Sequence, residues 1–90
     1  SILFVDHERL VVGMETQNCT FFENEEYGIK LSFSIKRGPI LTRDIFVTSL
    51  VNKIYRSTDG LYSCVDFRYT TLQEEDLRFL YEKATSTLFN

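Results

Sequence analysis

Residues 29–36 read IKLSFSIK and alternate strictly between apolar and polar side chains. Successive side chains of a β-strand point to opposite faces of its sheet, so this period of two is typical of a strand with one buried and one wet face. The longer segment 40–55 is rich in β-branched residues and carries apolar side chains on both faces. We therefore expect a second strand there, with a bend or bulge that switches its buried side midway.

The N-terminal third of the chain contains three further strand candidates. Residues 2–6 form an apolar run, residues 9–14 form a second, and residues 19–22 form a short third one. A tight turn is expected at residues 6–8, between the first two runs. Gly28 is expected to close a turn before the alternating strand.

The Asp59-Gly60 pair is a hairpin signal, and it predicts that residues 62–69 return as the last strand. A helix is expected at about residues 72–88. Five or six short strands followed by one helix are typical of a curled antiparallel sheet. The sequence therefore predicts a mainly β fold, a small antiparallel β-barrel of about six strands with one C-terminal amphipathic α-helix, as a single domain over residues 1–90.

The helix has its own start signal and its own apolar face. Thr71 and Glu74 have the spacing of a capping box, in which the hydroxyl caps the first turn and the carboxylate reaches back. The predicted docking face is an apolar stripe at helical spacing. It consists of Leu77, Leu80, Tyr81, Ala84 and Leu88.

Composition and charge narrow the function classes. The chain has 90 residues, 43% of them hydrophobic, and a formal net charge of −3. A negative chain lacks the field that nucleic-acid polymers and anionic membranes attract, so neither a nucleic-acid partner nor membrane insertion is expected. The opening residues do not read as a signal peptide, and the two cysteines make a poor disulfide framework. A cytoplasmic location is therefore expected.

No catalytic site and no metal site is expected from the residues that carry chemistry. His7 is the only histidine, and it lies between Asp6 and Glu8. Neighbouring side chains converge only in a turn, and no nucleophile stands nearby in a known context, so a solvated turn is favoured over a metal or catalytic site. No glycine-rich phosphate loop is present. The chain is expected to be no enzyme and to need no cofactor.

Basic residues gather loosely around two turns. They are read either as solubilising charge or as a patch for a nucleotide phosphate or an acidic partner. The two groups are Lys30, Lys36, Arg37 and Arg43, and Lys53 with Arg56.

The order of segments in the second half resembles the C-terminal part of a PilZ domain. The resemblance covers roughly residues 28–84. It runs from the alternating strand GIKLSFSI through the long strand 45–55 to DGLYSCVDF at 59–67 and LQEEDL at 72–77. PilZ domains are six-stranded antiparallel barrels, and many are receptors for the bacterial second messenger cyclic di-GMP. The resemblance thus implies a bacterial signalling or regulatory module.

The nucleotide motifs of that family are absent or degenerate here. Arg-x-x-x-Arg does not occur, and Asp-x-Ser-x-x-Gly has only an echo from Asp6 to Gly13, with Glu8 in place of the serine. The resemblance therefore implies a non-catalytic module with a degenerate cyclic di-GMP site. The alternative is a receptor with an altered site, for which Asp6, Arg9, Gly13 and Arg56 are the candidate nucleotide-binding residues.

Degenerate members of the family act mainly through protein contacts, so the partner implied is another protein or a second copy of this chain. The apolar end of the predicted helix is the candidate interface, with Tyr81, Leu88 and Phe89 as its residues.

Overall fold

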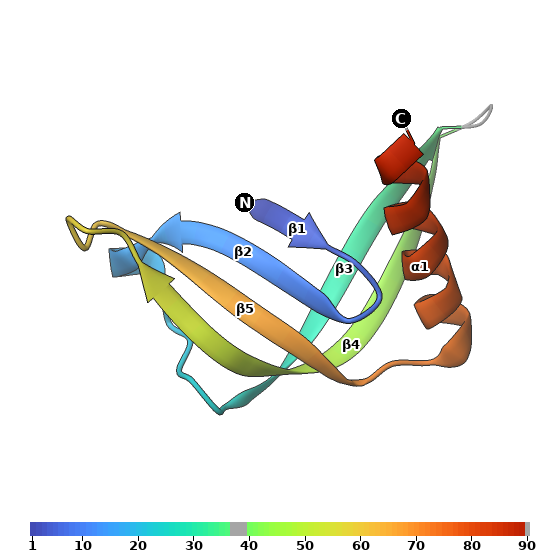
Figure 1. Ribbon diagram of the computed structural model, residues 1–90. Helices are drawn as coiled ribbons and strands as arrows, with labels where there is room; N and C mark the ends of the chain where they lie inside the picture. The colour runs from blue at the N-terminus through green and yellow to red at the C-terminus, as the bar shows by residue number, and fades with distance from the viewer. Residues whose placement is uncertain (37–39, 90) are drawn as a thin grey trace.

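The computed structural model in Figure 1 describes the backbone of residues 1–36 and 40–89, and the side chains of residues 1–34 and 42–82. Five strands, a short 3-10 helix and one α-helix follow each other along the chain. They are β1 (Ile2–Val5), β2 (Arg9–Glu15), η1 (Thr16–Asn18), β3 (Glu26–Lys36), β4 (Ile40–Arg56), β5 (Tyr62–Thr71) and α1 (Glu74–Phe89).

All strand pairs are antiparallel, in the order β1-β2-β5-β4-β3. The sheet curls strongly but does not close, since β1 and β3 remain its two edges among the described residues (Figure 1). The mainly β, antiparallel prediction with one C-terminal helix is confirmed. The number of strands is five rather than about six, and the sheet is a half-barrel rather than a closed barrel.

The missing strand is the candidate at residues 19–22, which forms no ladder. This segment crosses from β2 to the far edge of the sheet. Cys19 and Phe21 pack against the core, whereas Phe22 is 69% exposed. The Phe21 ring meets the rings of Tyr27 and Phe67 edge-on, each at 5.0 Å between centroids. The strand prediction there was wrong because Phe21 is apolar in order to pack its ring in the core, and not in order to pair with another strand.

The predicted irregularity in the long strand is confirmed. The pairing of β4 with β5 shifts between Val51 and Lys53, so that one extra residue is accommodated. Before the shift, Ile45, Val47 and Val51 are buried on the concave side of the sheet, and after it Ile54 packs against the same core. A bulge of this kind increases the local twist and lets one long strand curl around the core.

Two local predictions at the turns were wrong. Gly28 lies inside β3, opposite Thr48, so the turn ends earlier than expected. Thr71 pairs with Thr48 at the end of β5 and is therefore held in the sheet. The helix starts later, with the Leu77 amide donating to the Gln73 carbonyl at 2.9 Å, so Thr71 does not act as its cap. The predicted break at residues 37–39 lies outside the described residues.

Two aspartates organise the hairpins of the sheet. The Asp6 carboxylate accepts hydrogen bonds from the amides of Glu8 and Arg9, which closes the turn between β1 and β2 as predicted. The Asp59 carboxylate accepts from the Ser57 hydroxyl and the Leu61 amide, and both bonds lower the pKa of Asp59. Gly60 has a φ of +74°, a backbone conformation that favours glycine.

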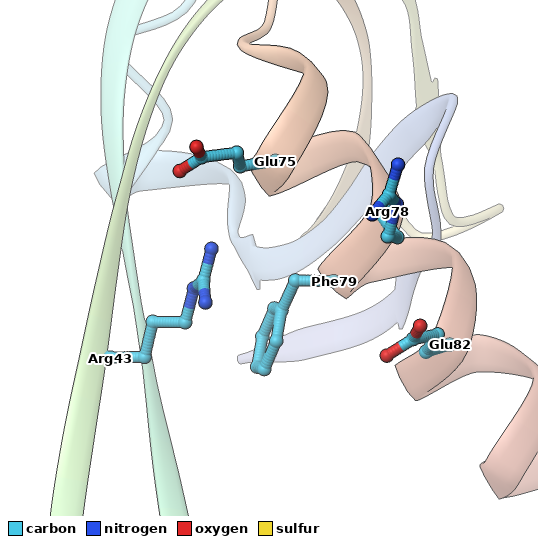
Figure 2. Close-up of a pocket in the computed structure, with 5 residues that line it drawn as sticks. All are labelled: Arg43, Glu75, Arg78, Phe79 and Glu82. Carbon is cyan, nitrogen blue, oxygen red and sulfur yellow. The ribbon is translucent and has the colours of Figure 1, made fainter.

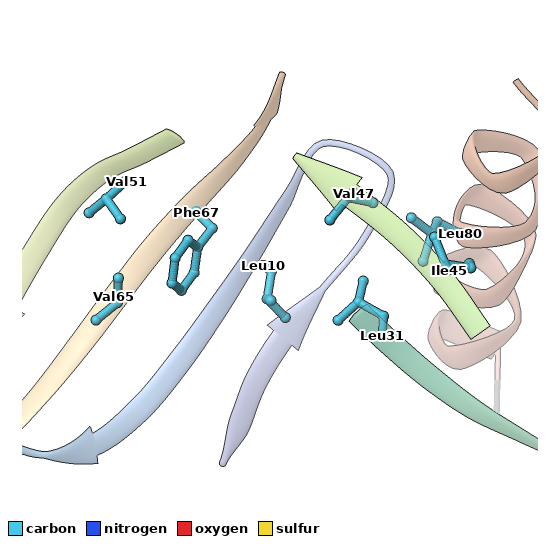
Figure 3. Close-up of a cluster of buried hydrophobic side chains, with 8 residues drawn as sticks. All are labelled: Leu10, Leu31, Ile45, Val47, Val51, Val65, Phe67 and Leu80. Atoms are coloured by element: carbon cyan, nitrogen blue, oxygen red, sulfur yellow. The ribbon is translucent and has the colours of Figure 1, made fainter. Parts of the chain in front are cut away.

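The core lies on the concave face of the sheet, and α1 packs against the end of it that includes Ile45 (Figure 3). Its eight buried side chains come from β2, β3, β4, β5 and the helix. They are Leu10, Leu31, Ile45, Val47, Val51, Val65, Phe67 and Leu80. A core of this size is what a chain of about 90 residues can bury.

The helix docks with a face slightly rotated from the predicted one. Leu80 is buried, and Phe79 meets Phe33 of β3 edge-on at 5.3 Å between ring centroids. Leu77 and Tyr81, both in the predicted stripe, are largely exposed instead. The apolar pattern located the helix, but Phe79 and not Leu77 faces the sheet because its ring fills the space beside Phe33.

Candidate functional site

The turn around Asp6 uses its polar groups internally. The Asp6 carboxylate is bonded to two backbone amides, at 2.8 and 2.9 Å. The His7 imidazole lies 3.6 Å from the Glu8 carboxylate, and its ring meets the Tyr81 ring of α1 edge-on at 5.1 Å. This contact ties the first turn of the chain to the helix. Within the described residues, no group of three or more histidine, cysteine or acidic side chains is arranged to hold a metal ion.

The backbone of Gly13 is hydrogen-bonded to Ser1, next to the edge strand β1. Its amide donates to the Ser1 carbonyl at 2.8 Å, and the Ser1 amino group donates to the Gly13 carbonyl at 2.7 Å. A Cβ added at Gly13 would lie 3.0 Å from Leu3 Cδ1. The glycine therefore lets the side chain of Leu3 lie close against β2.

The structure does not bring the candidate nucleotide-binding residues together. Arg9 is paired with Arg68 of β5, whereas Arg56 is paired with Ser63 of the same strand. Five residues of an extended strand span about 17 Å, so Arg9 and Arg56 lie toward opposite ends of the sheet. Asp6 and Arg9 are close in the first turn, and Gly13 lies farther along β2.

A different group of cations gathers on the outer, convex face of the sheet. Arg68 lies directly opposite Arg9, and Lys53 lies opposite Asp66. The inward positions of β2 and β5 hold core residues, so these alternate positions face outward. We call Arg9, Lys53 and Arg68 the cationic cluster.

Asp66 lies opposite Lys53 and beside Arg68, and it is buried, with 4% of its surface exposed. Its Oδ2 accepts a hydrogen bond from the Asn52 side chain at 3.2 Å and lies 3.5 Å from Arg68 Nε. Its Oδ1 is buried and has no hydrogen-bond partner within the described part of the chain. This contact is electrostatic, and it attracts the Arg68 guanidinium toward the buried Asp66 carboxylate.

The other two cations of the cluster rest on aromatic rings. The Arg9 guanidinium carbon lies 4.9 Å from the centroid of the Phe4 ring, and Lys53 Nζ lies 5.2 Å from that of Tyr55. Neither cation has a carboxylate within 4 Å in the part of the chain that the structure describes. Each of the three positive groups therefore has a defined neighbour, and of the three only Arg68 has a carboxylate within 4 Å among the described residues.

Figure 2 shows the side chains that line a pocket between β4 and α1. The Arg43 guanidinium forms an ion pair with Asp76 at 3.1 Å and stacks 4.5 Å from the Phe79 ring centroid. Glu75, Arg78 and Glu82 line the remaining wall. Because the central cation is already paired and stacked, these contacts hold the helix against the sheet.

The edge strand β1 exposes consecutive large apolar residues. Ile2 and Leu3 are each 58% exposed, and Phe4 is 43% exposed. Of the candidate interface residues on the helix, Tyr81 is exposed on one side of α1 and touches His7. The side chains of Leu88 and Phe89 lie outside the described part.

Sequence reasoning missed Arg68, Asp66 and the apolar edge. Asp66 and Arg68 are two residues apart in a predicted strand, which places them on one face, and this signal was available. The residues that they contact could not be predicted from the sequence. The order of the strands brings Arg9 beside Arg68, and only the bulge in β4 brings Asn52 beside Asp66.

Comparisons with family models, with curated proteins and with solved structures find no match to this chain. None of the helices in the described part has the length and apolar character that a bilayer crossing requires. The class of protein is thus defined by the fold itself, a mainly β half-barrel of five antiparallel strands with one C-terminal helix.

Proposed function

We propose that this chain is a non-catalytic, cytoplasmic regulatory module of a bacterial signalling pathway, a PilZ-like barrel with a degenerate cyclic di-GMP site that acts through protein–protein contacts. The order of strands and helix along the chain supports the family resemblance. The use of Asp6 inside its own turn and the distance between Arg9 and Arg56 support the degenerate nucleotide site.

The observation that carries the proposal is the exposed apolar edge formed by Ile2, Leu3 and Phe4. An edge strand has unpaired backbone groups on one side, and proteins commonly protect such edges with charges or prolines. Residues 1–5 contain neither a charged side chain nor a proline. An apolar strand that can also offer backbone hydrogen bonds is a typical site for addition of another strand.

A second copy of this chain is the partner that we propose for this edge. Two β1 strands can pair antiparallel about a two-fold axis, so that each copy covers the apolar residues of the other. A four-residue strand cannot by itself bury the roughly 800 Å² per partner of a stable complex. We therefore expect a weak dimer, with a dissociation constant on the order of micromolar to millimolar.

Sedimentation velocity over a range of concentrations tests this proposal. The weight-average sedimentation coefficient of the wild-type chain should rise with concentration, whereas Leu3→Lys should remain monomeric because a charge in the contact must be desolvated. Leu61→Lys is the matched control, since Leu61 is 65% exposed against 58% for Leu3 but lies at the β4–β5 hairpin. A wild-type chain that stays monomeric, or equal loss of association in both variants, would contradict the proposal.

The alternative function, a cyclic di-GMP receptor with an altered site, is favoured by one observation. Arg9 faces outward without a carboxylate partner among the described residues, and Arg is suited to phosphate recognition. An amide NMR titration with cyclic di-GMP separates the two functions. Saturable shifts at Arg9, Gly13 and Arg56 support the receptor, and their absence supports the degenerate module.

A further inference from the structure

The cationic cluster of Arg9, Lys53 and Arg68 takes no part in the core. It lies on the outer face of three adjacent strands, away from the concave side that holds the core. Like charges directly opposite each other on a sheet are destabilising, and Arg9 is directly opposite Arg68. A cluster that costs stability in the free protein can be compensated by a ligand of opposite charge.

The local charge specifies that ligand. The cationic cluster brings three positive side chains to one face of three adjacent strands, where only Arg68 has a carboxylate beside it, that of Asp66, so the cluster and Asp66 together carry two positive charges in excess. This excess stands on a chain whose formal net charge is −3, so it is not a consequence of general composition. A dianion matches it better than a monoanion.

The geometry of Arg68 is that of an arginine prepared for recognition. Its Nε faces the buried Asp66 carboxylate at 3.5 Å, and its side chain remains 46% exposed. A guanidinium that uses Nε for positioning still has the four N–H donors of its terminal nitrogens. Such a fork matches the oxygens of a phosphate or carboxylate in a bidentate arrangement.

The aromatic rings beside Arg9 and Lys53 also prepare these two side chains for binding a ligand. Stacking on Phe4 and Tyr55 limits the positions of Arg9 and Lys53 without using their hydrogen-bond donors. Less side-chain entropy is then lost when a ligand binds, so more of the interaction energy contributes to affinity.

We propose that the cationic cluster is a binding site for a phosphomonoester dianion. Arg68 and Arg9 donate to the phosphate oxygens, Lys53 adds charge from β4, and Asp66 is a positioning residue that orients Arg68. The chemistry is shared by free phosphate and by a phosphorylated side chain of a partner protein. It differs from a phosphodiester such as cyclic di-GMP, in which each phosphate carries one negative charge. The site does not depend on the self-association proposed above.

Amide NMR titrations of the whole chain test the site with defined probes. Inorganic phosphate should give saturable shifts at residues 9, 53, 66 and 68, with a dissociation constant on the order of 1 mM. The phosphodiester dimethyl phosphate should bind more weakly. Lowering the pH below about 6, where a phosphomonoester becomes a monoanion, should weaken phosphate binding as well.

Substitutions test whether Arg9 and Arg68 bind the phosphate. Arg9→Gln and Arg68→Gln should each weaken phosphate binding about tenfold or more, since a hydrogen bond to a charged group contributes ~1.5–3 kcal/mol. Arg78→Gln is the matched control on α1 and should bind like the wild-type chain. Arg68→Gln leaves Asp66 without its cation and can lower stability, so Arg9→Gln, which removes no buried partner, gives the independent test.

A short phosphoserine peptide and its unphosphorylated form distinguish the two sources of phosphate. Tighter binding of the phosphopeptide than of inorganic phosphate supports a phosphorylated protein as the ligand, and equal binding supports the free anion. The proposal is overturned if phosphate gives no saturable shifts, or if Arg78→Gln weakens binding as much as Arg9→Gln does. A monomeric wild-type chain would refute the dimer and leave this site unaffected.

Discussion

Tyr69 lies where β5 passes the turn between β1 and β2. Its hydroxyl donates to the Arg9 carbonyl at 3.2 Å, and its amide donates to the Glu8 carbonyl at the same distance. Burial raises the pKa of Tyr69 far above its ordinary value, and the nearby charge of Asp6 raises it further. One side chain thus links the core to the backbone that carries Arg9.

The raised pKa of Tyr69 makes stability depend on pH. Because the folded pKa exceeds the unfolded value of about 10, folding favours the neutral phenol, and this stabilisation is complete below about pH 10 and is lost as the pH rises further. Tyr69→Phe should cost about 0.5–1.5 kcal/mol at pH 7 through the lost hydrogen bond. The variant should also lose less stability than the wild-type chain on going to about pH 11.

Denaturant unfolding of both proteins at the two pH values measures the difference. If both proteins lose the same free energy of unfolding between the two pH values, the Tyr69 hydroxyl is not the group that titrates.

At the scale of elements, the docking of α1 depends on Arg43. The guanidinium pairs with Asp76 in the first turn of the helix and stacks on Phe79, which in turn meets Phe33 of β3. One side chain of β4 therefore fixes both the N-terminal end of the helix and its aromatic contact with the sheet. The Asp76 carboxylate also lies at the end of the helix where the dipole favours negative charge.

Arg43→Ala should destabilise the helix α1 more than the sheet. We expect a loss of about 1 kcal/mol in the free energy of unfolding, since the ion pair is partly exposed and the stacking adds a similar amount. Amide hydrogen exchange should accelerate in α1 and much less in β2 and β5. Arg78→Ala, also a loss of one arginine but at an exposed position, should change neither measurement. Uniform acceleration throughout the sheet would contradict this role.

The elements also show how far sequence reasoning reaches. Strict alternation in residues 29–36 and the Asp59-Gly60 turn are local signals, and each predicted its strand or hairpin correctly. Residues 19–22 have the same strand-favouring composition but cross between strands, because the place of a segment in the sheet depends on distant partners. For the same reason Arg9 was identified as a candidate while Arg68, its neighbour only through the β2–β5 pairing, was missed.

At the scale of the whole molecule, the half-barrel has a small core and two open edges. Phe67 lies near the centre of that core, 1% exposed, and the crossing segment reaches it through Phe21. The Tyr27 ring of the edge strand β3 also meets the Phe67 ring, 6.5 Å between centroids. In the sheet itself, the β1–β2 half is connected to β3 only through β5 and β4. The Phe67 ring adds a direct side-chain link between the two halves.

The same substitution at a buried and at an exposed phenylalanine measures how much the stability of the fold depends on Phe67. Phe67→Ala should cost about 3–5 kcal/mol, because it removes a fully buried ring and leaves a cavity. A domain of this size has roughly 5–13 kcal/mol in all, so the variant should be partly unfolded or close to it at 37 °C. Phe46→Ala, at a position that is 70% exposed, should change the free energy of unfolding by no more than about 0.5 kcal/mol. Circular dichroism during thermal unfolding compares the two. Similar costs at both positions would mean that the curled sheet does not depend on a core centred at Phe67, and that its open edges are supported by other contacts.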